Sequence, residues 1–505
     1  MSVRDLLPYV FYSASVLVLL WDVFLAGQIA QLRRAPRFFR GVTALAGLLI
    51  APAVLVAAAS ASILTGRAIH IIAWVWPLTL AIFAVQAIYA VGKRLVTPYI
   101  GVPIAAFDVI LAVAAFVRYA AYSGRDPSSA ALAVAAAQSS ALGMLLGRAA
   151  LFSPLAVVLP LLAPAYPARW RISATVRGTL AMLALAFTML FVAELPSALI
   201  AVRSYGTYAF DRLQERPRGD FVIGLRLFPA LGDAPPPLAL RSDLALVDSV
   251  GVGAISVVIE PAGARAGALD SLVRSLEEER RDSVLLVVAV GYDANARESF
   301  RRSPSAHMRA RLAAVDRIVR RLRPDIIVPA RNPYTEGVGA MGRVPLGWWQ
   351  EYHRLAAANT RRVSNRIRVG VVASAFVGAD SALYVWANRR DAPIDVVGFA
   401  FYPSYDGGAS LAARLRVADR WMRGTTKPHW VFGAGAFPVT HGEPSQARAL
   451  WGTLAWATSH EQVKGLIVES AGDYDMVTGL RAPGGRVRPA LATLERAVAA
   501  MAETQ

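Results

Sequence analysis

The stretch Phe221-Val-Ile-Gly-Leu-Arg-Leu-Phe228 decides the fold of the second half of this chain, because it opens a series of short β-branched runs. Seven further runs follow it, separated by segments whose apolar residues recur at three- and four-residue intervals. They cover residues 252–259, 284–290, 326–329, 368–374, 394–399, 429–432 and 463–468. Eight strands alternating with helices predict a (β/α)8 barrel over residues 221–505.

A doubly wound open sheet is the alternative for the same alternation. Its nucleotide-binding members carry GxGxxG or GxxxxGK[ST] after a strand. Neither pattern follows any of the eight runs. The barrel is therefore the favoured fold, and nucleotide binding loses its main support.

The residues before this series have the composition of a membrane domain. Apolar segments of spanning length cover about residues 6–30, 42–64, 71–91, 98–121, 130–153 and 179–202. Each is long enough to cross a bilayer of about 30 Å as a helix. Residues 1–202 are thus predicted to form a polytopic helical domain of about six spans, joined to the barrel by a polar linker at 203–220.

Basic loops set the expected orientation of these spans. They are cytoplasmic by the positive-inside rule, so six spans place the barrel in the periplasm of a bacterium, with the spans in its inner membrane. Residues 149–166, broken by three prolines, are interpreted as interfacial or re-entrant; as one more span they would move the barrel to the cytoplasm. The basic residues are Arg33, Arg34, Arg37, Arg40, Lys93, Arg94, Arg169, Arg171 and Arg177.

Five ionisable residues within the spans are functional candidates, because charge inside a membrane is costly. We favour a role in helix packing, for example through a pair of Asp108 with Arg148, over a proton or ion path. No internal repeat typical of transporters is apparent, so transport is the third hypothesis. The five are Asp22, Asp108, Arg118, Arg148 and Glu194.

Composition excludes several classes of chemistry. The chain has no cysteine, which rules out disulfides, thiolate zinc sites and iron-sulfur clusters. Its six histidines form no HxxxH or HExxH pair, so neither a metal nor another cofactor is predicted. The net charge of +18 resides in membrane loops and in helices with interleaved acids, and we predict no nucleic-acid partner.

Acids and aromatic residues gather where the predicted strands end, which is where barrel enzymes carry their sites. Aromatic rings stack on sugars and carboxylates accept hydrogen bonds from hydroxyls, so a carbohydrate is the expected ligand. For any single acid, capping of the next helix is an equal alternative. The candidates are Glu260, Tyr292, Asp293, Arg331, Asn332, Tyr334, Glu336, Tyr402, Tyr405, Glu469 and Asp473.

Three motifs in their order give a family resemblance over about residues 220–500. They are Asp395-Val-Val-Gly-Phe-Ala-Phe-Tyr402-Pro403, Lys427-Pro-His-Trp430-Val and Gly465-Leu-Ile-Val-Glu-Ser. The domain resembles the retaining glycoside hydrolases of the (β/α)8 clan that includes cellulase-like and galactanase-like enzymes. The resemblance implies a catalytic Glu at the end of the fourth strand and another at the end of the seventh.

This chain departs from that pattern at both positions, which hold Asn332 and Gly433. Retaining hydrolysis needs two carboxyl groups about 5 to 5.5 Å apart. The leading hypothesis is therefore a non-catalytic barrel that binds an envelope glycan, or docks as an accessory subunit of a membrane complex. The alternative is an active glycosidase with Glu336 and Glu469 as relocated acid and base, for which a separation of about 6.5 to 9.5 Å would indicate inversion.

Overall fold

The computed structural model forms two compact units, the first mainly Met1–Gly206 and the second mainly the residues from 207 onward. The structure describes residues 3–503 apart from 61–71, 123–129, 131–132, 135–136, 139–140, 142–157, 165–170, 211–212, 218, 280–282, 377, 403–408, 439–441 and 475–476.

The second unit is a closed barrel of eight parallel strands in chain order, with β1 pairing both β2 and β8. This confirms the predicted barrel and shows that the open-sheet alternative is wrong. Most strand residues are apolar and buried, as expected for a parallel sheet that is covered on both faces. The strands are β1 (Val222–Arg226), β2 (Ala254–Ile259), β3 (Leu285–Val290), β4 (Ile326–Val328), β5 (Arg368–Ala373), β6 (Val396–Phe401), β7 (His429–Ala434) and β8 (Val463–Val468).

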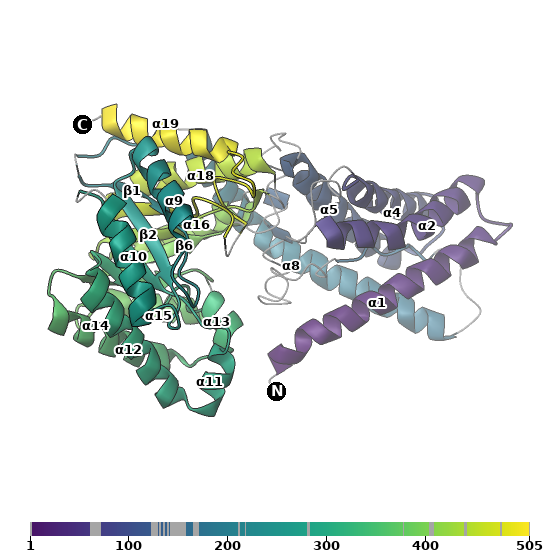
Figure 1. Ribbon diagram of the computed structural model, residues 1–505. Coiled ribbons are helices and arrows are strands. Elements are labelled where there is room, and N and C mark those ends of the chain that lie inside the picture. The colour runs from purple at the N-terminus through teal and green to yellow at the C-terminus, as the bar shows by residue number, and fades with distance from the viewer. Residues whose placement is uncertain are drawn as a thin grey trace. The chain divides into compact units, whose positions relative to one another are not determined.

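Helices surround these strands (Figure 1). Their ends carry recognisable signals: α12 begins after Ser303, whose hydroxyl accepts the Ala306 N–H at 3.3 Å, and α9 ends at Gly251 with a φ of 77°. The helices are α9 (Pro237–Val250), α10 (Ala266–Glu279), α11 (Ala296–Arg302), α12 (Pro304–Leu322), α13 (Glu336–Met341), α14 (Leu346–Val363), α15 (Gly378–Asn388), α16 (Ala409–Met422), α18 (Glu443–Thr458) and α19 (Pro489–Glu503).

The first unit is helical. Five of its helices are long and apolar enough to cross a membrane, and large side chains such as Leu48 and Leu55 remain more than 70% exposed, as lipid-facing residues would. The expected span at 130–153 lies almost wholly outside the described residues. The helices are α1 (Val3–Ala30), α2 (Arg37–Ser60), α4 (Val75–Gly92), α5 (Pro98–Tyr122) and α8 (Arg171–Phe210).

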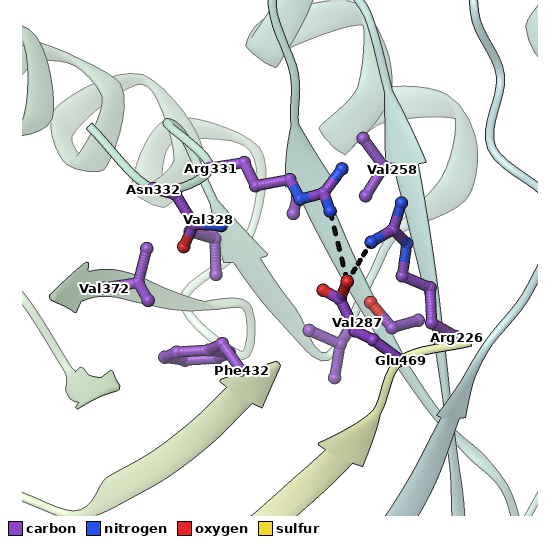
Figure 2. Close-up of a pocket in the computed structure, with 11 residues that line it drawn as sticks. Arg226, Val258, Val287, Val328, Arg331, Asn332, Val372, Phe432 and Glu469 are labelled. Carbon is purple, nitrogen blue, oxygen red and sulfur yellow. Dashed lines mark hydrogen bonds and ion pairs between the residues drawn. The ribbon is translucent and has the colours of Figure 1, made fainter. Parts of the chain in front are cut away.

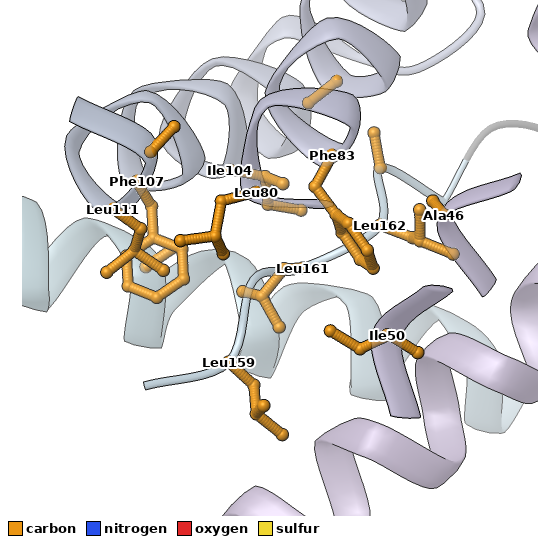
Figure 3. Close-up of a cluster of buried hydrophobic side chains, with 14 of the residues drawn as sticks. Ala46, Ile50, Leu80, Phe83, Ile104, Phe107, Leu111, Leu159, Leu161 and Leu162 are labelled. Carbon is orange, nitrogen blue, oxygen red and sulfur yellow. The ribbon is translucent and has the colours of Figure 1, made fainter. Parts of the chain in front are cut away.

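An extended segment accompanies these helices. The structure describes residues 158–164 of the proline-rich stretch, and they form neither helix nor strand. Leu159, Leu161 and Leu162 are buried in the same apolar cluster as Phe83 and Phe107 of the helices (Figure 3). An additional complete helical span through residues 149–166 would require residues 158–164 to be helical, and they are not.

The predicted linker at 203–220 differs from the structure in its first half. Helix α8 continues to Phe210, although Pro196 and Gly206 lie within it. Further on, Arg216 is buried against the loop before β8 and donates to the carbonyls of Thr458 at 3.1 Å and His460 at 2.8 Å. This end of the segment is therefore fixed to the barrel.

Candidate functional site

The centre of the site is one buried carboxylate held by two arginines. Glu469 directly follows β8, Arg226 ends β1, and Arg331 follows β4. Oε2 of Glu469 accepts hydrogen bonds from Nη1 of Arg226 and from Nη2 of Arg331, the latter at 3.2 Å (Figure 2). The side chains are 3%, 1% and 7% exposed, respectively. The barrel interior thus encloses a compact ion network.

The second predicted carboxylate joins the same network. Nε of Arg331 lies 3.2 Å from Oε1 of Glu336, which also accepts a hydrogen bond from the Asn332 amide at 2.7 Å. One guanidinium group therefore bridges Glu336 and Glu469. Because that group is small and planar, the nearest oxygens of the two carboxylates are no more than roughly 9 Å apart.

The two carboxylates have different surroundings. The Glu336 side chain is 32% exposed, whereas that of Glu469 is 3% exposed. Desolvation raises the pKa of Glu336 above the usual range; Arg331 opposes the rise, and the nearby Glu469 adds to it. A carboxyl group with a raised pKa beside an ion-paired carboxylate is the pattern that acid and base pairs use.

Gly433 explains where the Glu469 carboxylate lies. A Cβ atom added at Gly433 would lie 2.8 Å from Oε1 of Glu469 and 2.5 Å from the hydroxyl of Tyr402. The space that a side chain at 433 would enter is therefore filled by groups from β8 and from the end of β6.

The space around this network is small. A cavity lined by Arg226, Arg331, Glu469 and Phe432 has about 10 Å³ of free volume, enough for roughly one water molecule (Figure 2). Apolar side chains of the barrel interior, such as Val328 and Val372, also line it. A sugar ring does not reach Glu469 in this arrangement.

Three predicted tyrosines lie buried, with hydroxyls that have no partner among the described residues. Tyr292, Tyr334 and Tyr402 are 8%, 6% and 8% exposed, so their ring faces are packed inside the protein. The guanidinium of Arg311 lies 4.6 Å from the ring centre of Tyr292. Burial raises the pKa of Tyr334 to about 12, so its hydroxyl remains a donor at neutral pH.

Other predicted site residues brace loops. Asp293 accepts the Ala262 N–H at 2.8 Å. Asp473 forms a double ion pair with Arg488, at 2.6 and 2.7 Å. The Glu260 side chain is half-buried, and its own N–H donates to the carbonyl of Ala230 at 3.0 Å. Tyr405 lies outside the described residues.

The polar residues of the membrane spans are also partly described. Asp22 and Asp108 are fully buried and bind the extended segment. Oε2 of Glu194 lies 3.4 Å from the Ser197 hydroxyl. Arg148 and the side chain of Arg118 lie outside the described residues, so the expected pair of Asp108 with Arg148 remains a prediction.

Sequence reasoning missed Arg226. The signal was present, because an arginine within an apolar strand must point either to solvent or into a paired interior. Within the described part of the chain, no group of three or more His, Asp and Glu side chains is placed to hold a metal ion.

A second cavity lies at the same end of the barrel, beside the loop that follows β8. It has about 240 Å³ of free volume and is open to solvent. The Tyr474 ring next to it packs on Phe228 with a centre-to-centre distance of 4.5 Å. Its lining residues are Ala239, Ser242, Gly472, Asp473, Tyr474, Arg481, Ala482, Pro483, Gly484 and Gly485.

The fold and these sites define a (β/α)8 barrel joined to a helical unit with candidate membrane spans. Solved glycosidases share the barrel fold with this chain at low identity. A GH5_18 protein from Streptomyces cattleya, solved with Manb1-4GlcNAc, is 15% identical; the match covers 55% of this chain and 80% of that one, with a TM-score of 0.42. A β-glucosidase from Thermotoga maritima is 10% identical; the match covers 57% of this chain and 99% of that one, with a TM-score of 0.45.

A β-glucuronidase from Ruminococcus gnavus is 12% identical, with 54% of this chain covered and a TM-score of 0.40; the match spans about half of that protein, 51%. No protein-family model and no curated protein matches the chain. These likenesses concern the barrel fold, which the closed parallel sheet establishes by itself.

Proposed function

We propose that the barrel is a carbohydrate-binding domain that does not hydrolyse glycosides, and that the membrane helices hold it at the periplasmic face of a bacterial inner membrane. The observation that carries the proposal is the position of Arg331 between Glu336 and Glu469. In a glycosidase the scissile bond lies between the two carboxyl groups. Here a guanidinium group fills that place.

Access and charge support the same view. Glu469 is 3% exposed, and one of its oxygens is shared by two arginines. Releasing it for attack on a sugar would leave two buried guanidinium groups without their carboxylate, which costs several kcal/mol. The network is better suited to holding the barrel mouth in one shape than to turnover.

The open cavity beside Tyr474 is the proposed site of the glycan. It is lined by the Ser242 hydroxyl, the Tyr474 ring and the Arg481 guanidinium, and it opens to solvent with about 240 Å³ of free volume. Mixed polar groups beside aromatic rings suit sugar hydroxyls and ring faces. A docking role in a larger membrane complex would use this same face of the barrel.

A matched pair of variants tests the site. Ala239→Trp places an indole in the cavity, whereas Leu238→Trp lies on a neighbouring residue that is 78% exposed and does not line it. We expect full-length protein in detergent to retain an envelope polysaccharide, Ala239→Trp to lose most of this retention, and Leu238→Trp to keep it. Equal retention by both variants, or none by the wild-type protein across envelope polysaccharides, would refute the proposal.

A hydrolase with relocated carboxylates is the second candidate, and two observations favour it. The Glu469 carboxylate fills the space of a side chain at Gly433, and the pKa of Glu336 is raised, chiefly by burial. Such an enzyme would need Arg331 to leave the space between the carboxylates when substrate binds. It predicts turnover that Glu336→Gln abolishes.

A further inference from the structure

The extended segment at residues 158–164 is held in the helical unit by one polar side chain from each of three helices. The N–H of Leu161 donates to Oδ1 of Asp108 on α5, and that of Leu162 donates to Oδ1 of Asp22 on α1, both at 3.0 Å. Gln86 of α4 accepts from the Ala163 N–H at 2.9 Å and donates to the Ala163 carbonyl at 3.1 Å. Figure 3 shows the segment passing between the helices.

These contacts explain part of the polar content of the spans. Backbone groups that are not helical must find partners inside a membrane, because no water is present there. Gln86 meets this need completely, since its amide oxygen and nitrogen are both bonded to Ala163. A neutral amide is therefore sufficient for the structural task.

Asp22 and Asp108 each add a carboxylate, although a neutral acceptor would be enough to bind the backbone N–H. Each uses Oδ1 for one backbone N–H, and in each Oδ2 is buried without a hydrogen-bond partner among the described residues. Both residues are 0% exposed. Asparagine would accept the same hydrogen bond without bringing a negative charge.

The two carboxylates also lie far from the ends of their helices. Asp22 is near the middle of the candidate span Ser13–Ala30, and Asp108 is near the middle of Pro98–Val117. Their partners Leu161 and Leu162 are consecutive residues, so the two accepting Oδ1 atoms lie within roughly 10 Å of each other. An isolated ionised carboxylate at such depth is strongly disfavoured unless a positive charge joins it.

Protein cations do not supply that charge in the described part of the chain. Arg37 and Arg40 are at the beginning of α2, Arg177 is in the first turns of α8, and the acid Glu194 on α8 contacts Ser197. None of the arginines forms an ion pair with Asp22 or Asp108 among the described residues. Arg148 and the Arg118 side chain lie outside the described residues, and the buried Oδ2 atoms of Asp22 and Asp108, which lack a hydrogen-bond partner in the described part of the chain, leave a place for a bound ion.

We propose that Asp22 and Asp108 form a site for a small monovalent cation, a proton or an alkali ion, with the segment 158–164 as its scaffold. The unpartnered Oδ2 atoms are the ligand atoms. The proposal is independent of the glycan-binding role of the barrel, because it concerns a different unit and different residues.

Isosteric variants provide the test. Asp22→Asn and Asp108→Asn keep the acceptor for the backbone N–H and remove the charge, and Glu194→Gln is the control within the spans. In difference infrared spectra of the full-length protein in lipid nanodiscs, we expect a titrating carboxyl band that the double Asn variant loses and that Glu194→Gln keeps. Sodium or potassium added at constant pH shifts this titration if the ion is alkali, and leaves it unchanged if the ion is a proton.

A second measurement covers the case in which the Asn variants fail to fold. A hydrophobic carbodiimide modifies protonated carboxyl groups within membranes, and mass spectrometry locates the product. We expect Asp22 or Asp108 of the wild-type protein to be labelled. If the bound ion is a proton, labelling falls about tenfold per pH unit above the titration midpoint. If it is an alkali ion, adding that ion prevents labelling. The proposal would be overturned if the wild type and a folded double variant gave identical spectra. It would also be overturned if Glu194 were labelled and neither aspartate were labelled at any pH.

Discussion

Glu469 shows how one residue determines the character of the barrel mouth. Its carboxylate pairs with both Arg226 and Arg331 inside the barrel, and Arg331 has Glu336 as a second partner. Replacing one partner of a buried ion network leaves the others uncompensated, and this costs far more than the network contributes relative to an apolar core. Stability is therefore more sensitive to Glu469 than to any exposed acid.

We predict that Glu469→Gln lowers the free energy of unfolding of the barrel by about 3 to 5 kcal/mol. Denaturant titration of the full-length protein in detergent measures it. Glu298→Gln is the control, because Glu298 pairs with Arg302 at 2.6 Å while both side chains are more than 70% exposed; we expect a change within about 0.5 kcal/mol. Equal effects of the two variants would show that the buried network is not formed.

Glu336 leads to a prediction about pH. Burial, with help from Glu469, raises its pKa in the folded protein above the ordinary value of 4.5, so the folded state holds this proton more tightly than the unfolded state does. The resulting contribution to stability is present below about pH 4.5 and is lost as pH rises through the folded-state pKa. The melting temperature of Glu336→Gln relative to wild type should therefore rise between about pH 4 and about pH 7. A difference independent of pH would contradict this.

Much of the candidate site could be predicted from residues alone, and its burial could not. Glu336, Asn332, Arg331 and Glu469 were expected at the ends of strands, and the closed barrel brings them into one network. That Arg331 lies between the carboxylates depends on side-chain packing, which periodicity and spacing do not encode. Arg226 was missed because a single charge within an apolar run was taken as part of the strand.

At the scale of elements, the strands were predicted within a few residues because each is a short, mainly apolar run between polar segments. The junction between the units was less predictable. Its polar composition indicated a linker, but helix α8 persists to Phe210. In the segment after it, Gln214 and Arg216 bond to groups that are about 240 residues away in the sequence.

We predict that Arg216→Ala destabilises the barrel by about 3 kcal/mol, because it removes one of the two ion pairs of Asp220, leaving Lys464 as its partner, and removes hydrogen bonds to several buried carbonyl groups. Thermal unfolding followed by near-ultraviolet circular dichroism measures this effect. Arg320→Ala removes an ion pair to Asp316 from a side chain that is 61% exposed, and should change stability little. Similar losses in the two variants would mean that Arg216 does not fix the segment to the barrel.

At the scale of the whole molecule, the orientation of the membrane helices decides which compartment the barrel serves. The chain contains no cysteine, so single cysteines report orientation without background. We predict that a membrane-impermeant maleimide, applied to cells with a permeabilised outer membrane, labels Arg302→Cys on α11 and leaves Arg34→Cys unlabelled until the inner membrane is opened. The reverse pattern would place the barrel in the cytoplasm.

The most direct test of the central claim is the release of reducing ends from a polysaccharide that the purified full-length protein retains. With Arg331 bridging Glu336 and Glu469, we predict retention without release, and the same background rate for wild type and Glu336→Gln. Release by the wild-type protein that Glu336→Gln abolishes would contradict the account and establish a glycosidase with relocated carboxylates.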